Sequence, residues 1–172
     1  MSRNSILKVF LVSIVVFGAL GSAVAQMPNP YGPAISLENA KKTAAPALAE
    51  AAKNKWTVAV AIVGPDGTLV YYEKMDNTQL GSAEVAIDKA RTAVLFKRPT
   101  KAFQDVLAGG GEGLRILTLK GVVAVEGGIP LLVDGKIVGA IGVSGATSAQ
   151  PFSRGSFGGS SGAMGRAASS HR

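Results

Sequence analysis

Residues 127–146 read GGIPLLVDGKIVGAIGVSGA, and this stretch decides the fold class. Two apolar runs rich in β-branched residues, 129–133 and 136–143, are separated only by Asp134-Gly135. An Asp-Gly pair suits the two-residue turn whose backbone needs positive φ angles. We therefore predict that the two runs form an antiparallel β-hairpin.

A second hairpin is predicted upstream of the first. Residues 56–63 alternate and are rich in β-branched types, 64–67 read GPDG as a turn, and 68–74 read as the returning strand. Residues 117–125 predict one further strand. Because strands joined by tight turns are antiparallel, we expect a mostly antiparallel five-stranded sheet.

Helical spacing marks the segments that cover this sheet. Residues 37–54 carry apolar side chains at helical intervals behind Ser36, a suitable N-cap, and Pro46 should kink or split that helix. A third, short helix is predicted to start at Thr100 as its N-cap and to reach Leu107, followed by a mobile glycine loop at 109–113.

The middle helix, predicted at 83–97 with Ser82 as its cap, has a face made of methyl groups. That face comprises Ala83, Ala86, Ala90 and Ala93. Glycines within a strand favour the close approach of another element, and three punctuate the last strand: Gly139, Gly142 and Gly145. We expect these glycines to pack against the alanine face. The fold class is therefore α/β with α+β layering, in a single domain over 36–150.

The two ends differ from the domain. Residues 1–25 resemble a signal peptide, with basic Arg3 and Lys8, an apolar stretch and the small-x-small site that ends at Ala25. This predicts a periplasmic or secreted protein without a stable membrane anchor. Residues 26–35 read as an extended leader, and 151–172 as a Gly/Ser-rich disordered tail.

Composition excludes several kinds of site. The 172 residues include no Cys and one His, and 18 Lys plus Arg against 11 Asp plus Glu give a net charge of +7. Thiolate metal sites, disulfides and His-dependent triads are therefore excluded or very hard to assemble, and we predict no metal site and no catalytic set. The domain also lacks a basic stripe interleaved with aromatics, so no nucleic-acid partner is expected.

Two stretches resemble one known family. Residues 86–93, AIDKARTA, and 96–100, FKRPT, are similar to the KA-x-TA … F-x-R-P-T signature of the GlcG/HbpS haem-binding-like family. The stretch 127–146 resembles that family's glycine-rich hairpin, and the resemblance covers roughly residues 35–150. It implies the five-stranded α/β sandwich, self-association into dimers or larger rings, and a link to haem or corrinoid handling and to extracellular sensing. The Gly/Ser tail departs from the family pattern.

Four residues are the candidate ligand-binding set: Lys89, Arg98, Thr100 and Glu126. Arg98 could pair with a ligand carboxylate, and Thr100 could offer its oxygen at a helix start. A desolvated Lys89 could anchor an anion or form a Schiff base, and Glu126 could act as a base or ligand contact. The structural alternatives are an N-cap for Thr100, a surface helix charge for Lys89 and a solvated charge for Arg98, while Glu126 has no second carboxylate to partner it in the sequence.

The expected function is that of an exported small-molecule-binding protein of the GlcG/HbpS type, with haem or a related tetrapyrrole as first candidate ligand. Without His or Cys in the domain, the iron ligand would come from weaker donors, and haem binding should be weak. The candidate donors are Met75, Tyr71, Tyr72, Lys89 and Thr100. The alternatives are an enzyme acting on a small carboxylated metabolite and an accessory partner of an extracytoplasmic membrane sensor.

Overall fold

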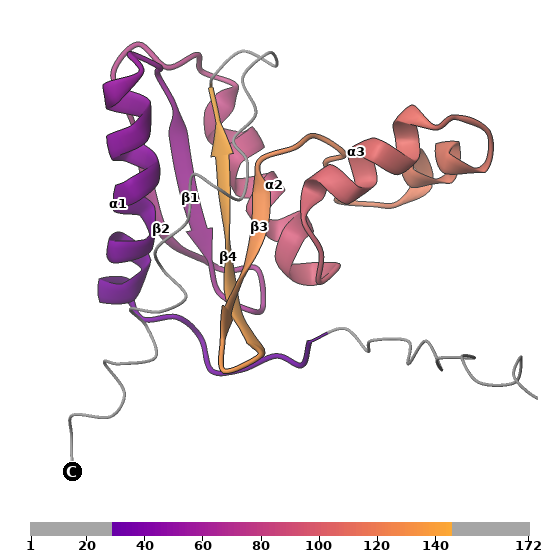
Figure 1. The fold of residues 1–172 in the computed structure, drawn as a ribbon, viewed down its shortest axis with the longest axis horizontal. Coiled ribbons are helices and arrows are strands. Elements are labelled where there is room, and N and C mark those ends of the chain that lie inside the picture. The colour runs from indigo at the N-terminus through magenta and orange to yellow at the C-terminus, as the bar shows by residue number, and fades with distance from the viewer. Residues whose placement is uncertain (1–28, 146–172) are drawn as a thin grey trace, which may run out of the picture.

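The computed structural model describes residues 29–145 as a sheet with a helix on each side and a helical arm that projects from it (Figure 1). Along the chain the elements are α1 (Leu37–Lys53), β1 (Ala59–Val63), β2 (Leu69–Lys74), α2 (Ser82–Leu95), α3 (Thr100–Ala108), the 3-10 helix η1 (Gly111–Thr118), β3 (Gly128–Val133) and β4 (Lys136–Ser144). The predicted signal peptide and the Gly/Ser tail lie outside the described residues.

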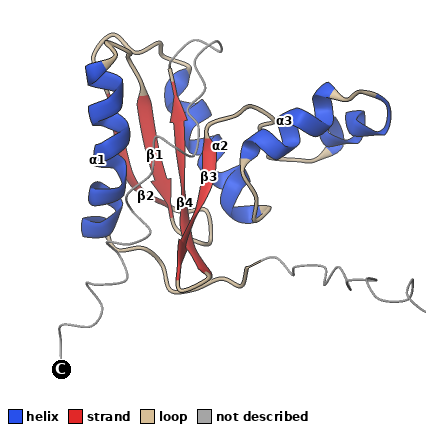
Figure 2. Ribbon diagram, viewed as in Figure 1, coloured by secondary structure: helices blue, strands red, loops and turns tan. Residues whose placement is uncertain are grey.

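The sheet is antiparallel throughout, with strand order β2-β1-β4-β3. Figure 2 shows α1 and α2 on its opposite sides. The α+β layering is thus confirmed. Both predicted hairpins are present, and the turn between β3 and β4 has φ angles of 48° at Asp134 and 72° at Gly135, as an Asp-Gly turn requires.

The number of strands was predicted wrongly, since the described sheet has four strands instead of five. The predicted strand at 117–125 begins inside η1 and continues as irregular chain. The predicted loop at 109–113 likewise contains the start of η1 at Gly111. Within the described part of the chain, residues 117–125 pair with no strand of the sheet, and Leu117 is 70% exposed. Neither backbone hydrogen bonds to a strand nor burial of Leu117 therefore stabilises an extended conformation there.

Helix α1 is continuous, so Pro46 does not split it. Ser36 caps its start by accepting the N–H of Asn39 at 3.3 Å, as predicted. Pro46 is exposed, and the carbonyl that lacks its usual N–H partner one turn earlier can be satisfied by water. The buried face of α1 packs on the sheet through four alanines: Ala40, Ala44, Ala47 and Ala51.

Helix α2 lies very close to the other face of the sheet. Ala61, Gly142 and Gly128 are register partners across β1, β4 and β3. A Cβ on Gly142 would lie 2.0 Å from the carbonyl oxygen of Ala86, so a side chain there would collide with α2. The predicted contact between glycines and the alanine face is confirmed for Gly142.

Two other predictions about α2 are wrong: the contacts expected from Gly139 and Gly145, and the cap expected at Ser82. A Cβ on Gly139 would meet Val63, and one on Gly145 would meet Thr57, so neither glycine receives α2. Ser82 is the first residue of α2 and not its cap, which is Gly81. The Ser82 side chain is fully buried and hydrogen-bonded to the hydroxyl of Ser144 at 3.4 Å, which leaves it no capping geometry.

The segment ahead of α1 is attached to the domain. Tyr31 forms a parallel bridge with Ile137, whose N–H donates to the carbonyl of Pro30 at 2.8 Å. The Tyr31 hydroxyl donates to the carbonyl of Val94 at 3.0 Å, at the end of α2. Within 29–145, no helix has the length and apolar character needed to cross a membrane.

Candidate functional site

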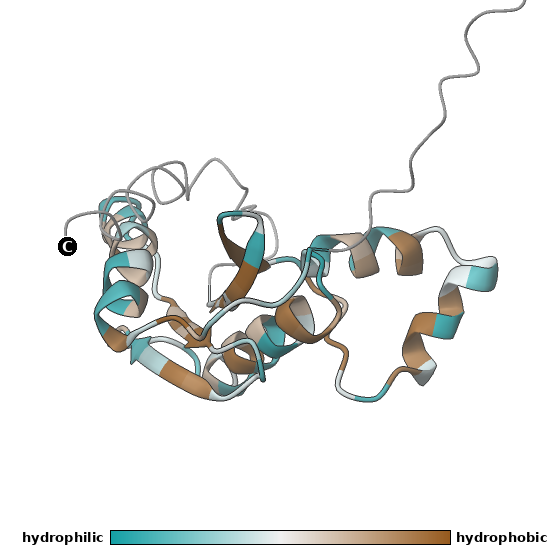
Figure 3. Cartoon of the chain, turned by 90° about the horizontal axis from the view of Figure 1, so that it is seen from below, coloured by the Kyte–Doolittle hydropathy of each residue, from teal (hydrophilic) through white to brown (hydrophobic). Residues whose placement is uncertain are grey.

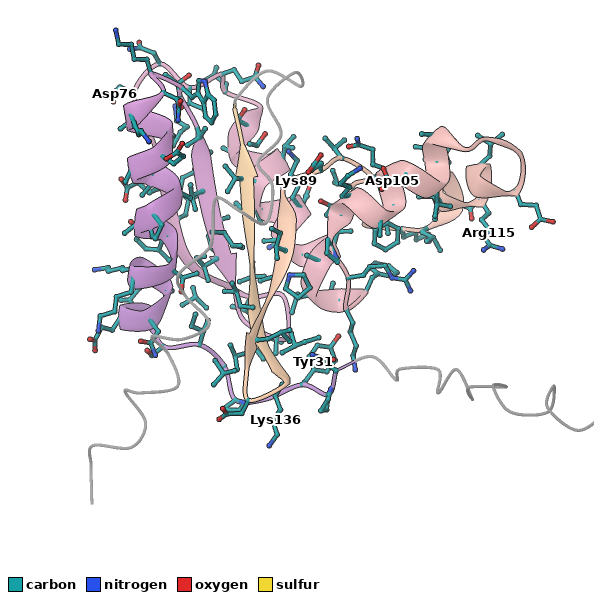
Figure 4. The ribbon with its side chains drawn as sticks, in the orientation of Figure 1. Tyr31, Asp76, Lys89, Asp105, Arg115 and Lys136 are labelled. Carbon is teal, nitrogen blue, oxygen red and sulfur yellow. The ribbon has the colours of Figure 1, made fainter. Side chains whose placement is uncertain are left out.

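The site lies where the arm joins the sheet. We use "the arm" for residues 100–127, which comprise α3, η1 and the segment that returns to β3. Figure 4 labels Lys89 near the base of this arm and Arg115 near its far end. The base is closed by the Thr100 hydroxyl, which accepts the backbone N–H of Gly128 at 2.8 Å. Lys89 and Thr100 flank Gly128 there, and Glu126 is close enough to act on the charge of Lys89.

Lys89 extends from α2 toward the sheet, and only 6% of its surface is exposed. Its Nζ donates to the carbonyl oxygen of Val143 at 3.1 Å. Burial lowers the pKa of Lys89, since an ammonium loses its hydration there, and the negative charge of Glu126 opposes that shift. The amine is therefore easier to deprotonate than that of an exposed lysine.

Two glycines let the chain approach Lys89 closely, one at its amine and one at its backbone. Gly127 has φ of 124°, and a Cβ there would lie 3.1 Å from Nζ of Lys89. A Cβ on Gly128 would lie 2.3 Å from the Lys89 carbonyl oxygen. The pair lets the chain pass close to Lys89 where β3 begins, and Glu126, the residue before the pair, is close enough to act on the charge of Lys89.

Thr100 is not an N-cap, which corrects that structural alternative. Pro99 occupies the cap position, and Thr100 is the first residue of α3, fully buried. Its hydroxyl fixes Gly128, as described above, because the chain after Pro99 directs the side chain inward. A direct ligand contact by Thr100 stays a prediction.

Arg98 points away from this cluster. It is exposed, with its guanidinium 5.2 Å from the centre of the Phe103 ring and its Nε donating to the Phe96 carbonyl at 3.3 Å. The two phenylalanines make an edge-to-face contact at 5.5 Å. The structure thus groups three of the four predicted residues and leaves Arg98 on the aromatic side of the α2–α3 junction.

Sequence reasoning missed two polar residues of the arm. Gln104 accepts the backbone N–H of Glu126 at 2.8 Å and so positions it. The pKa of Lys101 is raised, first by its hydrogen bond to Asp105 and also by the charges of Asp105 and Glu126. The Lys101/Asp105 spacing of four residues was a signal in the sequence, whereas nothing local distinguishes Gln104.

Electrostatics separate the candidate iron donors. A hydrogen bond with Glu73 raises the pKa of Tyr71, and burial raises that of Tyr72, so both phenolates are disfavoured. Met75 packs against the core under α1. Lys89 is the candidate whose shift favours the form that binds a metal, although the described residues contain no cluster of three or more His, Cys, Asp or Glu side chains that could hold an ion.

Comparisons with known proteins agree with this architecture. A family model described as "Haem degrading protein HbpS-like" matches residues 35–151. Protein GlcG of Escherichia coli K12 is 38% identical over 95 residues, which cover 55% of this chain and 69% of GlcG.

Two solved structures share the fold. The crystal structure of HbpS aligns with a TM-score of 0.62 and 29% identity, covering 90% of this chain and 100% of HbpS. The crystal structure of a PduOC–haem complex aligns with a TM-score of 0.60 and 32% identity, over 67% and 86% of the two chains. The family model covers well over half of the sequence, and the chain belongs to the HbpS-like family.

Proposed function

We propose that this chain is a binding protein for haem or a related tetrapyrrole with carboxylate groups, which it holds at the base of the arm. The observation that carries the proposal is the buried junction of Lys89 and Thr100 at Gly128, with Glu126 close enough to act on the charges of Lys89 and of Lys101, the second residue of α3. The PduOC–haem complex, 32% identical in sequence, supports the choice of ligand.

The residues present fit such a ligand. The amine of Lys89 can be deprotonated more easily than an exposed one and would supply an iron ligand, and Lys101 supplies a positive charge for a propionate. When bound, haem would supply a redox-active iron. Val125, next to Glu126 in the chain, is an exposed apolar side chain at this base, whereas the exposed Leu114 and Leu117 lie toward the far end of the arm. Figure 3 shows hydrophobic residues along α3 and η1.

Haemin titration tests this proposal. We expect a Soret shift with the protein that starts at Gln26, loss of that shift in Lys89→Leu, and weaker binding in Lys101→Leu. Lys136→Leu, which changes the exposed first residue of β4, is the matched control and should bind like the parent. A parent protein without a Soret shift would overturn the proposal.

We also propose that two copies associate through their arms. Leu114 and Leu117 are exposed on η1, which also carries the oppositely charged Glu112 and Arg115. In a two-fold arrangement, Glu112 of one copy would face Arg115 of the second, since such interfaces are self-complementary. Leu114 and Leu117 of both copies would then be buried from solvent in the interface.

Sedimentation analysis tests the association. Leu117→Lys should shift the protein toward the monomer, whereas Leu80→Lys changes a leucine that is 85% exposed outside the arm and should not. A parent protein that is monomeric at all concentrations would contradict self-association. Leu114 and Leu117 would then be a surface for another partner, such as the membrane sensor named in the sequence analysis.

The third part of the proposal is export. The basic start, apolar stretch and small residues before Gln26 support a cleaved signal peptide. Mass spectrometry of the protein from a periplasmic or culture fraction should find an N-terminus at Gln26. A protein that keeps Met1 would overturn this part.

A further inference from the structure

The chain contains two Asp-Gly pairs, Asp66-Gly67 in the β1–β2 turn and Asp134-Gly135 in the β3–β4 turn. A glycine after an aspartate leaves its own backbone nitrogen unshielded, because glycine has no Cβ. That nitrogen can attack the side-chain carboxyl of the aspartate, which is the first step of isomerisation to isoaspartate. By sequence alone, the two pairs have the same reactivity.

The Asp66-Gly67 pair is held by hydrogen bonds at both reacting groups. The Asp66 carboxylate accepts the backbone N–H of Thr68 at 3.0 Å and the Thr68 hydroxyl at 2.7 Å. The Gly67 N–H donates to the Gly64 carbonyl at 3.0 Å. A Cβ on Gly67 would lie 3.8 Å from the Leu95 side chain, so the end of α2 also limits movement of this turn.

The same bonds keep the Asp66 side chain ionised. The hydrogen bond from the Thr68 hydroxyl, followed by that from the Thr68 N–H, lowers the pKa of Asp66. A carboxylate ion is a poorer electrophile than the acid, since one of its oxygens must leave as water. Asp66 is thus protected by its position and by its charge.

The Asp134-Gly135 pair has none of these restraints. Among residues 29–145, the Asp134 side chain has no hydrogen-bond or ion-pair partner and the Gly135 N–H has no acceptor. Both residues are exposed, at the end of the hairpin that Figure 4 marks with Lys136. A Cβ on Gly135 would meet nothing within 4 Å. The carboxyl and the amide nitrogen can therefore approach each other when the turn flexes.

We propose that Asp134 is a modification site, at which aspartate isomerises spontaneously to isoaspartate, whereas Asp66 is protected by its own turn. The reaction needs no enzyme or ligand and is independent of tetrapyrrole binding. Isoaspartate adds one carbon to the backbone of a two-residue turn, and the length of such a turn sets the register of its strands. Modification would therefore weaken the pairing of β3 with β4, which places Gly128 opposite Gly142.

The reaction conserves every atom. The lone pair of the Gly135 nitrogen attacks Cγ of Asp134, a C–N bond forms, and the amide proton leaves with the carboxyl hydroxyl as one water, which gives a five-membered succinimide. Water then attacks the former backbone carbonyl carbon of Asp134, and the bond from that carbon to nitrogen breaks. The nitrogen takes one proton of this water and the carbon keeps the hydroxyl, so the chain now runs through Cγ and its mass is unchanged.

Peptide mass spectrometry of the aged protein tests the proposal. The full protein is kept folded in neutral buffer at physiological temperature, and electron-transfer fragmentation distinguishes isoaspartate from aspartate at each pair. We expect isoaspartate to form several-fold faster at Asp134 than at Asp66. In guanidinium chloride, where the turns are lost, the two rates should become similar. Equal rates in the folded protein overturn the proposal, and an unchanged ratio in guanidinium chloride overturns its structural cause.

The variant Thr68→Ala tests why Asp66 is protected. Thr68 is exposed, and this change removes the hydroxyl that binds Asp66 but keeps the backbone N–H. Isoaspartate should form several-fold faster at Asp66, while Asp134 in the same molecules is the internal control and should keep its rate. No increase at Asp66 overturns the protection by Thr68.

Thermal unfolding tests the effect on the hairpin. Protein that contains isoaspartate at Asp134 is separated from unmodified protein by hydrophobic-interaction chromatography, and the two fractions are melted side by side. The modified fraction should unfold at a lower temperature, because its turn no longer fits the register of β3 on β4. Equal midpoints overturn the effect on strand pairing.

Discussion

The hydroxyl of Thr100 accepts the backbone N–H of Gly128 at 2.8 Å, and this bond joins the first residue of α3 to the first residue of β3. The arm therefore leaves the domain and returns to it at one buried point. With the bond from the Glu126 N–H to Gln104, it fixes the segment next to Lys89.

Replacing Thr100 with valine should destabilise the domain. Valine keeps the shape but leaves the buried N–H of Gly128 without an acceptor, which costs about 1–3 kcal/mol. Urea denaturation should show this loss, and Thr100→Ser, which keeps the hydroxyl, should recover part of it. Equal midpoints for the parent and Thr100→Val would contradict the role of this bond.

Replacing Gly142 with alanine should separate α2 from the sheet. The added Cβ would lie 2.0 Å from the Ala86 carbonyl oxygen and 2.7 Å from the Ala90 nitrogen, both backbone atoms. Overpacking of this kind costs about 1–3 kcal/mol or more. Thermal unfolding should report a lower midpoint.

Gly81→Ala is the matched control for Gly142→Ala. A Cβ at Gly81 would meet nothing within 4 Å, and its φ of −63° suits any residue. This variant should melt like the parent, and a similar loss in both variants would show that the close approach of α2 is not the cause.

Lys89→Met should change how stability depends on pH. In the folded protein the pKa of Lys89 lies below its ordinary value of 10.5, because burial penalises the ammonium. Between those two values the unfolded chain binds more protons, so the parent becomes more stable as pH rises toward 10.5, and the burial penalty is largest at lower pH.

The measurement is the difference in unfolding free energy between Lys89→Met and the parent at several pH values. A constant part of that difference includes the lost hydrogen bond to Val143. The variant's relative stability should fall as pH rises. Lys136→Met should show no such trend, and a pH-independent difference for Lys89→Met would refute the lowered pKa.

Thr92 should control the return segment of the arm. Its hydroxyl accepts the N–H of Val123 at 2.9 Å and donates to the carbonyl of Gly121 at 3.2 Å. Thr92→Val removes both bonds, so the Val123 amide should exchange hydrogen faster by at least several-fold. Thr78→Val, which changes a buried hydroxyl near Met75, should leave exchange at Val123 unchanged.

The hairpins and helices were predictable because their signals are local. The Asp134-Gly135 turn needs positive φ angles that few other pairs accept, and the alanine spacing in α2 is visible in the sequence. Residues 117–125 have the composition of a strand, yet their backbone bonds to the Thr92 side chain, a contact between distant residues that no local pattern encodes.

The site could be predicted only in part, because its geometry also depends on contacts between residues far apart in the sequence. Lys89 and Glu126 are unusual for their positions and could be selected singly, but their proximity depends on how the arm returns to the sheet. Gln104 resembles any polar helix residue, and its bond to the Glu126 backbone is a tertiary contact. The aromatic contact that takes Arg98 away from the site is tertiary as well.

The bridge between Tyr31 and Ile137 sets a limit on how far the N-terminus can be shortened. A chain beginning at Gln26 retains Pro30 and Tyr31, whereas one beginning at Ser36 would lose the acceptor for the Ile137 N–H and the hydroxyl that binds the last turn of α2. Under the proposed export, the cut near Gln26 would therefore have to leave Pro30 and Tyr31 in place. A cut after Tyr31 would leave the Ile137 N–H, near the start of β4, without the Pro30 carbonyl that accepts it.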